Sequence, residues 1–99
     1  MHPVETVHTY EQMKLLADAR RLAILRLLMA QPATLTQLAA TLKQSPAWVR
    51  HHVKALEAAR LVELAEVRTT GTVTEKYYRA CSQALLLQEV ILPRSRKPT

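Results

Sequence analysis

The sequence predicts a mainly helical fold that carries one small β-hairpin. Leucine, isoleucine and valine recur at helical spacing over most of the first 60 residues. The pattern then changes to short β-branched and alternating runs on either side of the only glycine, Gly71. An apolar stretch at residues 82–92 returns to helical spacing and is followed by a proline. The expected order is therefore four helices, two strands and a last helix (α-α-α-α-β-β-α).

Length and composition are those of one small domain, which we expect to span residues 1–99. Lys and Arg total 14 against 8 Asp and Glu, and this excess favours a polyanionic partner, nucleic acid before an anionic membrane surface. The single cysteine, Cys81, excludes an internal disulfide framework and four-cysteine zinc sites. No stretch approaches the ~18 apolar residues of a membrane span, and no signal-peptide core begins the chain. We therefore expect a cytoplasmic protein.

Two helices are expected before residue 32. The first covers residues 10–17 and begins there or as early as residue 4, with one apolar side formed by Tyr10, Met13 and Leu16. Asp18 is the expected N-cap of the second helix, residues 18–30. Pro32 ends this helix. Its apolar stripe consists of Leu22, Leu25, Leu28 and Met29, widened by Ile24 and Leu27.

Residues 34–60 predict two helices joined by a tight turn. Thr34 and Gln37 form a capping box at the start of the first, residues 34–42. Ser45 is the N-cap of the second, and Pro46 takes its first helical position. This second helix has two faces. The inner face holds Val49, Val53 and Leu56, and the outer face holds Ala47, Arg50, His51, Lys54 and Ala58. Such a pair of helices is typical of a helix-turn-helix, whose second helix enters the major groove of DNA.

The outer face suits a duplex, although a solvated helix surface is the ordinary role of charged residues. Arg50 has the side chain to bond a guanine bidentately, Lys54 is expected to contact a phosphate, and His51 could do either. Ala47 allows close approach of the DNA. Ser45 is first a cap, and its helix-start N–H groups could also meet a phosphate.

Two neighbouring aromatic residues are expected to pack. Trp48 is expected to lie against the preceding helix, with its indole N–H free to bond a phosphate or a carbonyl. His52 is expected to be a packed side chain that also reaches the backbone.

A β-hairpin is expected next, with strands at residues 61–67 and 73–79 and a polar loop at residues 68–72. Tyr77 and Tyr78 should pack the hairpin on the core. The polar residues of the hairpin form either a mobile surface loop or contacts to the minor groove and phosphates, and these residues are Arg68, Thr70, Thr72 and Lys76. A helix-turn-helix followed by such a hairpin is a winged helix-turn-helix.

The order of motifs resembles the ArsR/SmtB family of bacterial and archaeal transcriptional regulators. The stretches that carry the resemblance are LADARRLAILRLL at residues 16–28, TLTQLAATL at 34–42, SPAWVRHHVKALEAARLVE at 45–63 and EKYYR at 75–79. The resemblance implies a winged-helix DNA-binding protein that forms a homodimer. It also implies that the helices outside the winged core, residues 1–17 and 82–92, form the dimer interface. Residues 93–99 are expected to be a disordered basic tail.

The sequence departs from the family at several places. Lys43 stands where glycine is frequent in the turn, and Arg60 stands where glycine often ends the second helix of the motif. The cysteine pair of the metal-sensing branch is absent from residues 34–42, and residues 82–92 offer only Glu89. We therefore predict no metal site and no cofactor. Cys81 with His2 and His8 could form an intersubunit site, but a small buried side chain is the simpler interpretation.

The favoured function is a sequence-specific DNA-binding transcriptional regulator, a repressor that recognises a palindromic operator in double-stranded DNA as a homodimer. No catalytic constellation and no glycine-rich phosphate loop occurs, so we expect no enzyme. The effector ligand is unknown. Two alternatives are a winged-helix protein-interaction module of a larger assembly and a metal or thiol sensor that uses Cys81.

Overall fold

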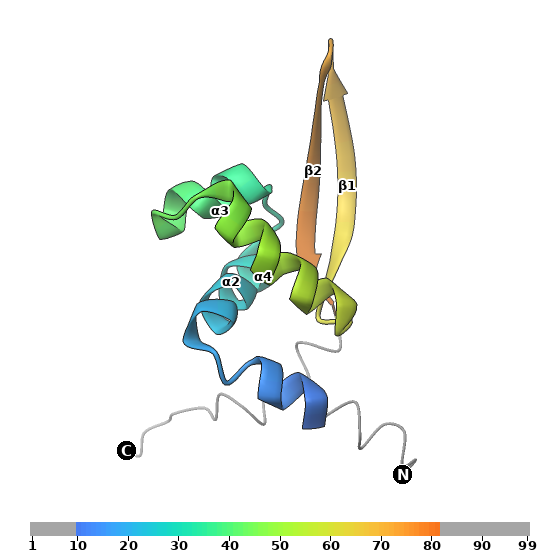
Figure 1. Ribbon diagram of the computed structural model, residues 1–99. Helices are drawn as coiled ribbons and strands as arrows, with labels where there is room; N and C mark the ends of the chain where they lie inside the picture. The colour runs from blue at the N-terminus through green and yellow to red at the C-terminus, as the bar shows by residue number, and fades with distance from the viewer. Residues whose placement is uncertain (1–9, 82–99) are drawn as a thin grey trace, which may run out of the picture.

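The computed structural model describes residues 10–81 of the chain. A helical segment at residues 10–15 comes first. It is followed by α2 (Ala19–Ala30), α3 (Leu35–Leu42), α4 (Pro46–Ala58), β1 (Val62–Thr70) and β2 (Val73–Ala80). The helices gather in one body from which the hairpin projects (Figure 1). This confirms the mainly helical fold with a β-hairpin, whereas the helix expected at residues 82–92 and the tail at 93–99 lie outside the described residues.

The three labelled helices begin where the capping residues predicted. The Asp18 side chain accepts from the backbone N–H of Arg20 at 2.8 Å, ahead of α2. Thr34 and Gln37 form both bonds of the capping box, at 2.9 and 3.0 Å. Ser45 Oγ accepts from the Trp48 N–H at 3.1 Å, ahead of α4. Each helix start therefore depends on side chains within three residues of the cap.

The ends of α3 and α4 share one unusual backbone feature. Lys43 and Arg60 have positive φ angles of 58° and 64°. After Lys43, the Gln44 N–H donates to the Ala39 carbonyl at 3.0 Å, which is the long bond of a Schellman motif. Leu61 donates to the Leu56 carbonyl at 2.9 Å in the same way after Arg60. Both positions adopt the left-handed conformation that glycine takes most easily.

The core lies between α2, α4 and the base of the hairpin. Its fully buried side chains come from all three of these elements and from α3, and they include Ile24, Leu25, Leu28, Leu38, Val49, Val53, Leu56, Leu61 and Val62. The stripe predicted for α2 faces this core, since Ile24, Leu25 and Leu28 are buried in it and Leu22, Leu27 and Met29 are half-buried against it. This face belongs to a helix that packs against both α4 and β2.

The hairpin is longer than its apolar pattern predicted. Both strands extend toward the tip, so Arg68 and Thr70 belong to β1 and only Gly71 and Thr72 form the turn. Gly71 has φ +63°, as the first central residue of a type II′ turn requires. A bulge interrupts the antiparallel register between Leu64 and Glu66. At the base, Ala33 pairs with Tyr78 through bonds of 2.9 and 3.0 Å, which ties the hairpin to the α2–α3 loop.

The helical segment at residues 10–15 turns a different side to the domain than expected. Tyr10 and Met13 are 61% and 38% exposed, whereas Gln12 is 3% exposed. The Gln12 side-chain amide donates to the Ala59 carbonyl at 2.8 Å, beyond the end of α4. Leu16 is buried beside this contact as predicted, at 3% exposure. This hydrogen bond and the burial of Leu16 select the inner side, so Tyr10 and Met13 of the predicted apolar side are left exposed.

None of the helices described within residues 10–81 is long and apolar enough to cross a bilayer.

Candidate nucleic-acid interface

The outer face of α4 is a cationic ridge, defined here by Ala47, Arg50, His51 and Lys54. All four residues are exposed, whereas Val49, Val53 and Leu56 on the inner face are completely buried. The two faces thus lie as the helical spacing predicted. Anchoring of the inner face in the core holds the ridge as one rigid surface.

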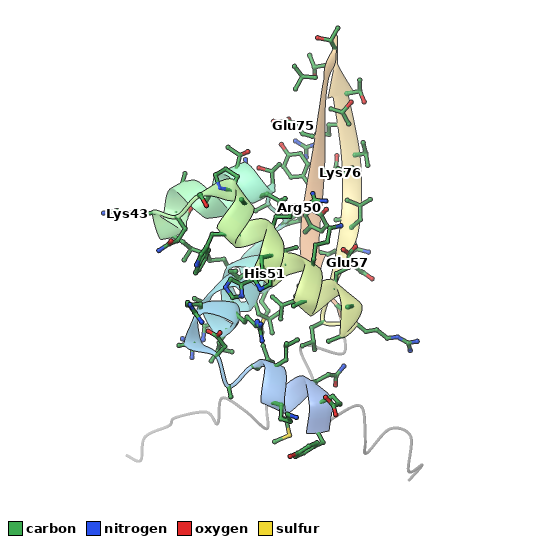
Figure 2. All side chains as sticks on the ribbon, in the orientation of Figure 1. Lys43, Arg50, His51, Glu57, Glu75 and Lys76 are labelled. Carbon is green, nitrogen blue, oxygen red and sulfur yellow. The ribbon has the colours of Figure 1, made fainter. Side chains whose placement is uncertain are left out.

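Arg50 and Lys76 line one open groove between α4, the start of α3 and the hairpin. The groove has a volume of about 370 Å³, and its other lining residues are Thr34, Leu35, Thr36, Thr74, Glu75 and Tyr78. Figure 2 shows Arg50 and Lys76 approaching from the two elements. Neither cation forms a salt bridge with another of the described residues. Both are therefore available to an external anion.

Lys54 has one acidic neighbour. Its Nζ lies 3.2 Å from the Glu57 carboxylate, with the two side chains 47% and 33% exposed. An exposed pair of this kind is weak, of order 0–1 kcal/mol. Lys54 can therefore exchange Glu57 for a phosphate at small cost.

Arg68 lies on the opposite face of the hairpin from Lys76. It pairs with Glu75 across the strands, whereas Lys76 pairs with Val67 on the alternate face. The Arg68 guanidinium contacts the Glu66 carboxylate at 2.6 Å and covers the Tyr77 ring at 4.2 Å. The hydrogen bond from Arg68 holds the pKa of the Glu66 carboxyl below its usual value. The structure thus brings Lys76 to Arg50 and keeps Arg68 apart, while Thr72 lies in the turn at the hairpin tip.

The two tyrosines of β2 have different surroundings. Tyr78 is 3% exposed and joins the core, as predicted for packing residues. Tyr77 is half-buried on the other face of the hairpin, where its hydroxyl donates to Glu75 at 3.5 Å. Of the two tyrosines, Tyr78 is thus the one that fastens the hairpin to the helices through the buried core.

Trp48 and His52 form a small aromatic cluster under the start of the ridge. Trp48 is half-buried and lines one hollow with Leu42 of α3, in agreement with packing against the preceding helix. Its ring meets His52 edge-on, with centroids 4.7 Å apart. His52 is buried as expected, but its partner is a side chain and not the backbone, since Nδ1 accepts from Arg21 Nε at 3.2 Å.

Sequence reasoning missed two polar residues that hold α4, Gln12 and Arg21. A signal existed for Arg21, which shares its helical face with Ile24, Leu25 and Leu28. An arginine within an apolar stripe needs a polar partner. The sequence did not identify the partner, His52, because it lies 31 residues further along the chain.

The described residues offer no group of three or more His, Cys, Asp or Glu side chains that could hold a metal ion. Cys81 is half-buried, and this burial raises the pKa of its thiol. The nearby Glu63 carboxylate raises it further by a smaller amount. A raised pKa leaves less of the reactive thiolate at neutral pH. His2 and His8, which the sensor alternative requires, lie outside the described residues.

Comparison with known proteins gives a consistent result. The profile described as "Bacterial regulatory protein, arsR family" matches residues 18–63. The winged helix-turn-helix DNA-binding domain Mb0332 of Mycobacterium bovis, described as homodimeric and as a possible ArsR-family transcriptional regulator, is 27% identical with a TM-score of 0.67. This match covers 88% of the present chain and 79% of that chain.

The transcriptional regulator HlyU shares the fold. HlyU of Vibrio vulnificus is 24% identical, with a TM-score of 0.63 and coverage of 88% of this chain and 84% of that chain. HlyU of Vibrio cholerae is 20% identical, with a TM-score of 0.69 and coverage of 90% and 94%. No curated protein sequence matches the chain. The family match identifies residues 18–63 as the helix-turn-helix of the ArsR family, which consists of DNA-binding transcriptional regulators and not of enzymes, and the wing observed here completes that fold.

Proposed function

We propose that this protein is a homodimeric repressor that recognises a palindromic operator in the cytoplasm. The observation that carries the proposal is the exposed cationic ridge of α4, held rigid from behind by completely buried valines and leucine. A helix of this kind fits the major groove, where side chains distinguish the base pairs. Bound across a promoter, such a dimer would block RNA polymerase.

Each residue of the ridge has a role in this proposal. Arg50 bonds a guanine edge, because its guanidinium is exposed and unpaired by any described acid. Lys54 and Lys76 contact phosphates on either side of the DNA major groove, and His51 contacts a base or a phosphate. The small side chain of Ala47 lets the DNA come close to the backbone of α4.

The flanking residues contribute from the start of α4 and from the wing. The Ser45 hydroxyl is engaged in capping, so its contribution is through the helix-start N–H groups. Trp48 contributes its indole N–H. Arg68 and Thr72 contact the neighbouring backbone or minor groove from the outer face and tip of the hairpin.

The dimer is supported by the homodimeric description of the Mb0332 domain and by the first helical segment. Tyr10 and Met13 on that segment are exposed large apolar side chains on the side away from the domain. A second copy would cover such residues. We therefore propose residues 1–17 and 82–92 as the interface, with half-sites about one helical turn apart, ~34–36 Å.

Selection from a random duplex pool tests this function. We expect enrichment of an inverted repeat, a dimer by light scattering, and a log affinity that falls linearly with log salt by about 0.9 per phosphate contact. Recovery of no preferred sequence, together with affinity that salt does not change, would instead support the protein-interaction alternative. A reporter gene whose promoter carries the operator either upstream or downstream of it then separates repression from activation, by whether the protein lowers or raises expression.

A further inference from the structure

We propose that Arg21 is a positioning residue for DNA recognition, which sets the orientation of the ridge through its hydrogen bond to His52 and releases it when His52 is protonated. The proposal rests on the proposed function, because it concerns how α4 is held for contact with DNA. Neither Arg21 nor His52 touches DNA in this scheme. Both lie behind the ridge, at the junction of α2 and α4.

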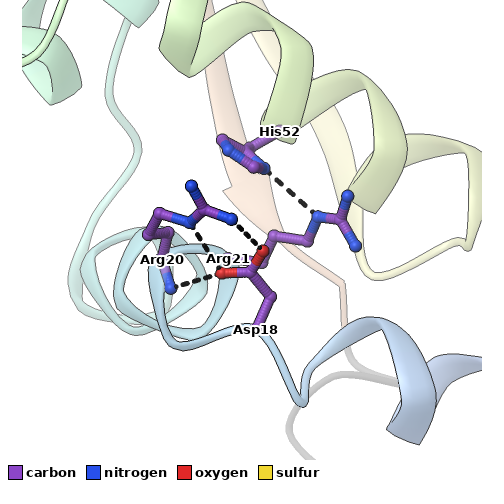
Figure 3. A network of polar contacts seen from close by, with 4 residues as sticks. All are labelled: Asp18, Arg20, Arg21 and His52. Carbon is purple, nitrogen blue, oxygen red and sulfur yellow. Dashed lines mark hydrogen bonds and ion pairs between the residues drawn. The ribbon is translucent and has the colours of Figure 1, made fainter.

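The geometry joins two helices through one partly buried contact. Arg21 projects from the first turn of α2, and its Nε donates to Nδ1 of His52 near the middle of α4 at 3.2 Å (Figure 3). His52 is 4% exposed and Arg21 is half-buried. This hydrogen bond is costly to leave unmade on the His52 side, because the buried acceptor would lose its partner.

His52 in turn touches two residues that the proposed function assigns to DNA. Its ring meets Trp48 edge-on at 4.7 Å and 68°, and it meets His51 edge-on at 5.1 Å and 71°. A rotation of the His52 ring therefore changes its contacts with both of these neighbours. A displacement of about 1 Å is enough to spoil a geometrically demanding contact.

The bond exists only while His52 is neutral. Because Arg21 Nε–H is the donor, Nδ1 must carry a lone pair, so the neutral ring has its proton on Nε2. Protonation of Nδ1 removes the acceptor and places a second cation against the guanidinium. The arrangement therefore has one bonded state and one repulsive state.

The charges around His52 favour the neutral state. On α2 it faces Arg21, Arg20 and the N-cap Asp18, and on α4 it faces His51. Asp18 would attract a proton to His52, but its carboxylate is engaged by Arg20 at 2.9 and 3.0 Å. Burial is the largest cause that lowers the pKa of His52 below its usual value of 6.5, and the charge of Arg21 is the second. The bonded state is thus the one present at neutral pH.

Acid should consequently lower specific binding more than non-specific binding. Non-specific binding depends on the exposed charge of the ridge, which attracts the phosphates of any duplex. Protonation of His52 adds no exposed charge at the ridge and disturbs only its positioning. The ratio of specific to non-specific affinity should therefore fall with decreasing pH.

The test measures that ratio by fluorescence anisotropy, with the selected operator and a scrambled duplex at constant ionic strength from pH 5.5 to 8. Arg21→Met removes the donor but keeps the aliphatic stem. Arg26→Met removes an equal charge from an exposed position of the same helix and serves as the matched control. At pH 7.5 we expect Arg21→Met to lower the ratio roughly tenfold, within the range of one base contact, and Arg26→Met to leave it unchanged. Arg21→Lys keeps a donor and should restore part of the ratio.

His52→Asn tests the titration separately. The Asn side-chain oxygen stays within reach as an acceptor for Arg21 but does not titrate. We expect this variant to keep a ratio near that of the parent at pH 7.5 and to lose its decline in acid, while the three other histidines remain common to both proteins.

Three results overturn the proposal: an unchanged ratio in Arg21→Met, an equal fall in Arg26→Met, or the parent's pH dependence retained in His52→Asn. If Arg21→Met unfolds, as circular dichroism would show, the His52→Asn profile decides alone. Failure of the proposed function is distinguishable, because the parent protein itself would then prefer no duplex.

Discussion

Arg50 and Arg68 carry the same charge in different surroundings, so they should contribute unequally to operator binding. Arg50 lies on the ridge and shares a groove with Lys76, whereas Arg68 is held by Glu66 on the far face of the hairpin. We expect Arg50→Ala to weaken operator binding by about 1–3 kcal/mol and to relax the preference at one base pair. Arg68→Ala should weaken binding less, and equally for all sequences.

Anisotropy titrations with the parent operator and a second selection on each variant measure both effects. Our assignment of Arg50 is wrong if Arg50→Ala binds the operator as tightly as the parent and selects the same bases. A larger loss in Arg68→Ala would place the main DNA contact on the opposite face of the hairpin.

Single side chains were predictable from the sequence when their partners are close along the chain. Thr34 finds Gln37 within one helical turn, so the local pattern alone specified both bonds. Arg21 and His52 are 31 residues apart, and their meeting depends on how α2 crosses α4. Gln12 and Ala59 are 47 residues apart and were missed for the same reason. The exposed ridge was predictable because helical periodicity determines it.

The two helix ends with left-handed residues offer a direct gain in stability. Lys43 ends α3 with φ 58°, a conformation that costs a residue with a Cβ roughly 1–2 kcal/mol. We expect Lys43→Gly to raise the free energy of unfolding by up to about 1 kcal/mol, since the greater freedom of glycine in the unfolded chain offsets part of the relief. Urea denaturation followed by circular dichroism measures the change.

Lys43→Ala is the matched control, because it removes the same charge and keeps the Cβ. We expect no comparable stabilisation from it. If alanine stabilises as much as glycine, the gain comes from removal of the charge, and backbone strain at Lys43 is not its cause.

The hairpin shows where element boundaries could not be predicted. Near its tip β1 and β2 are exposed on both faces, so no alternation of apolar and polar residues marks them as strands. Arg68, Thr69 and Thr70 belong to β1 because they pair across the hairpin with residues of β2. Gly71 located the turn correctly, because a positive φ is needed there whatever the strand length.

Across the whole domain, α4 is held on every side but one. Its inner face enters the core, its middle receives Arg21 from α2, and the Ala59 carbonyl at its end accepts from Gln12. Leu61 and Val62 follow as buried residues that lead into β1. The fold thus immobilises one helix and leaves its cationic side to solvent. Stability of the domain and presentation of the ridge therefore depend on the same contacts.

This dependence predicts how the stability of the domain responds to pH. Burial and then Arg21 lower the pKa of His52 in the folded state, so between 6.5 and the lowered value the unfolded chain binds more protons at this residue. Its contribution to stability is therefore fully present above pH 6.5 and is lost progressively as the pH falls from 6.5 through the folded-state pKa. Urea denaturation at pH 7.5, 6.5 and 5.5 should show this decline in the parent and a shallower one in His52→Asn. Because acidic groups of the fold are common to both proteins, the difference between the two slopes isolates His52. Parallel slopes would mean that His52 is protonated as easily in the folded chain as in the unfolded one, and that the contact with Arg21 does not hold it neutral.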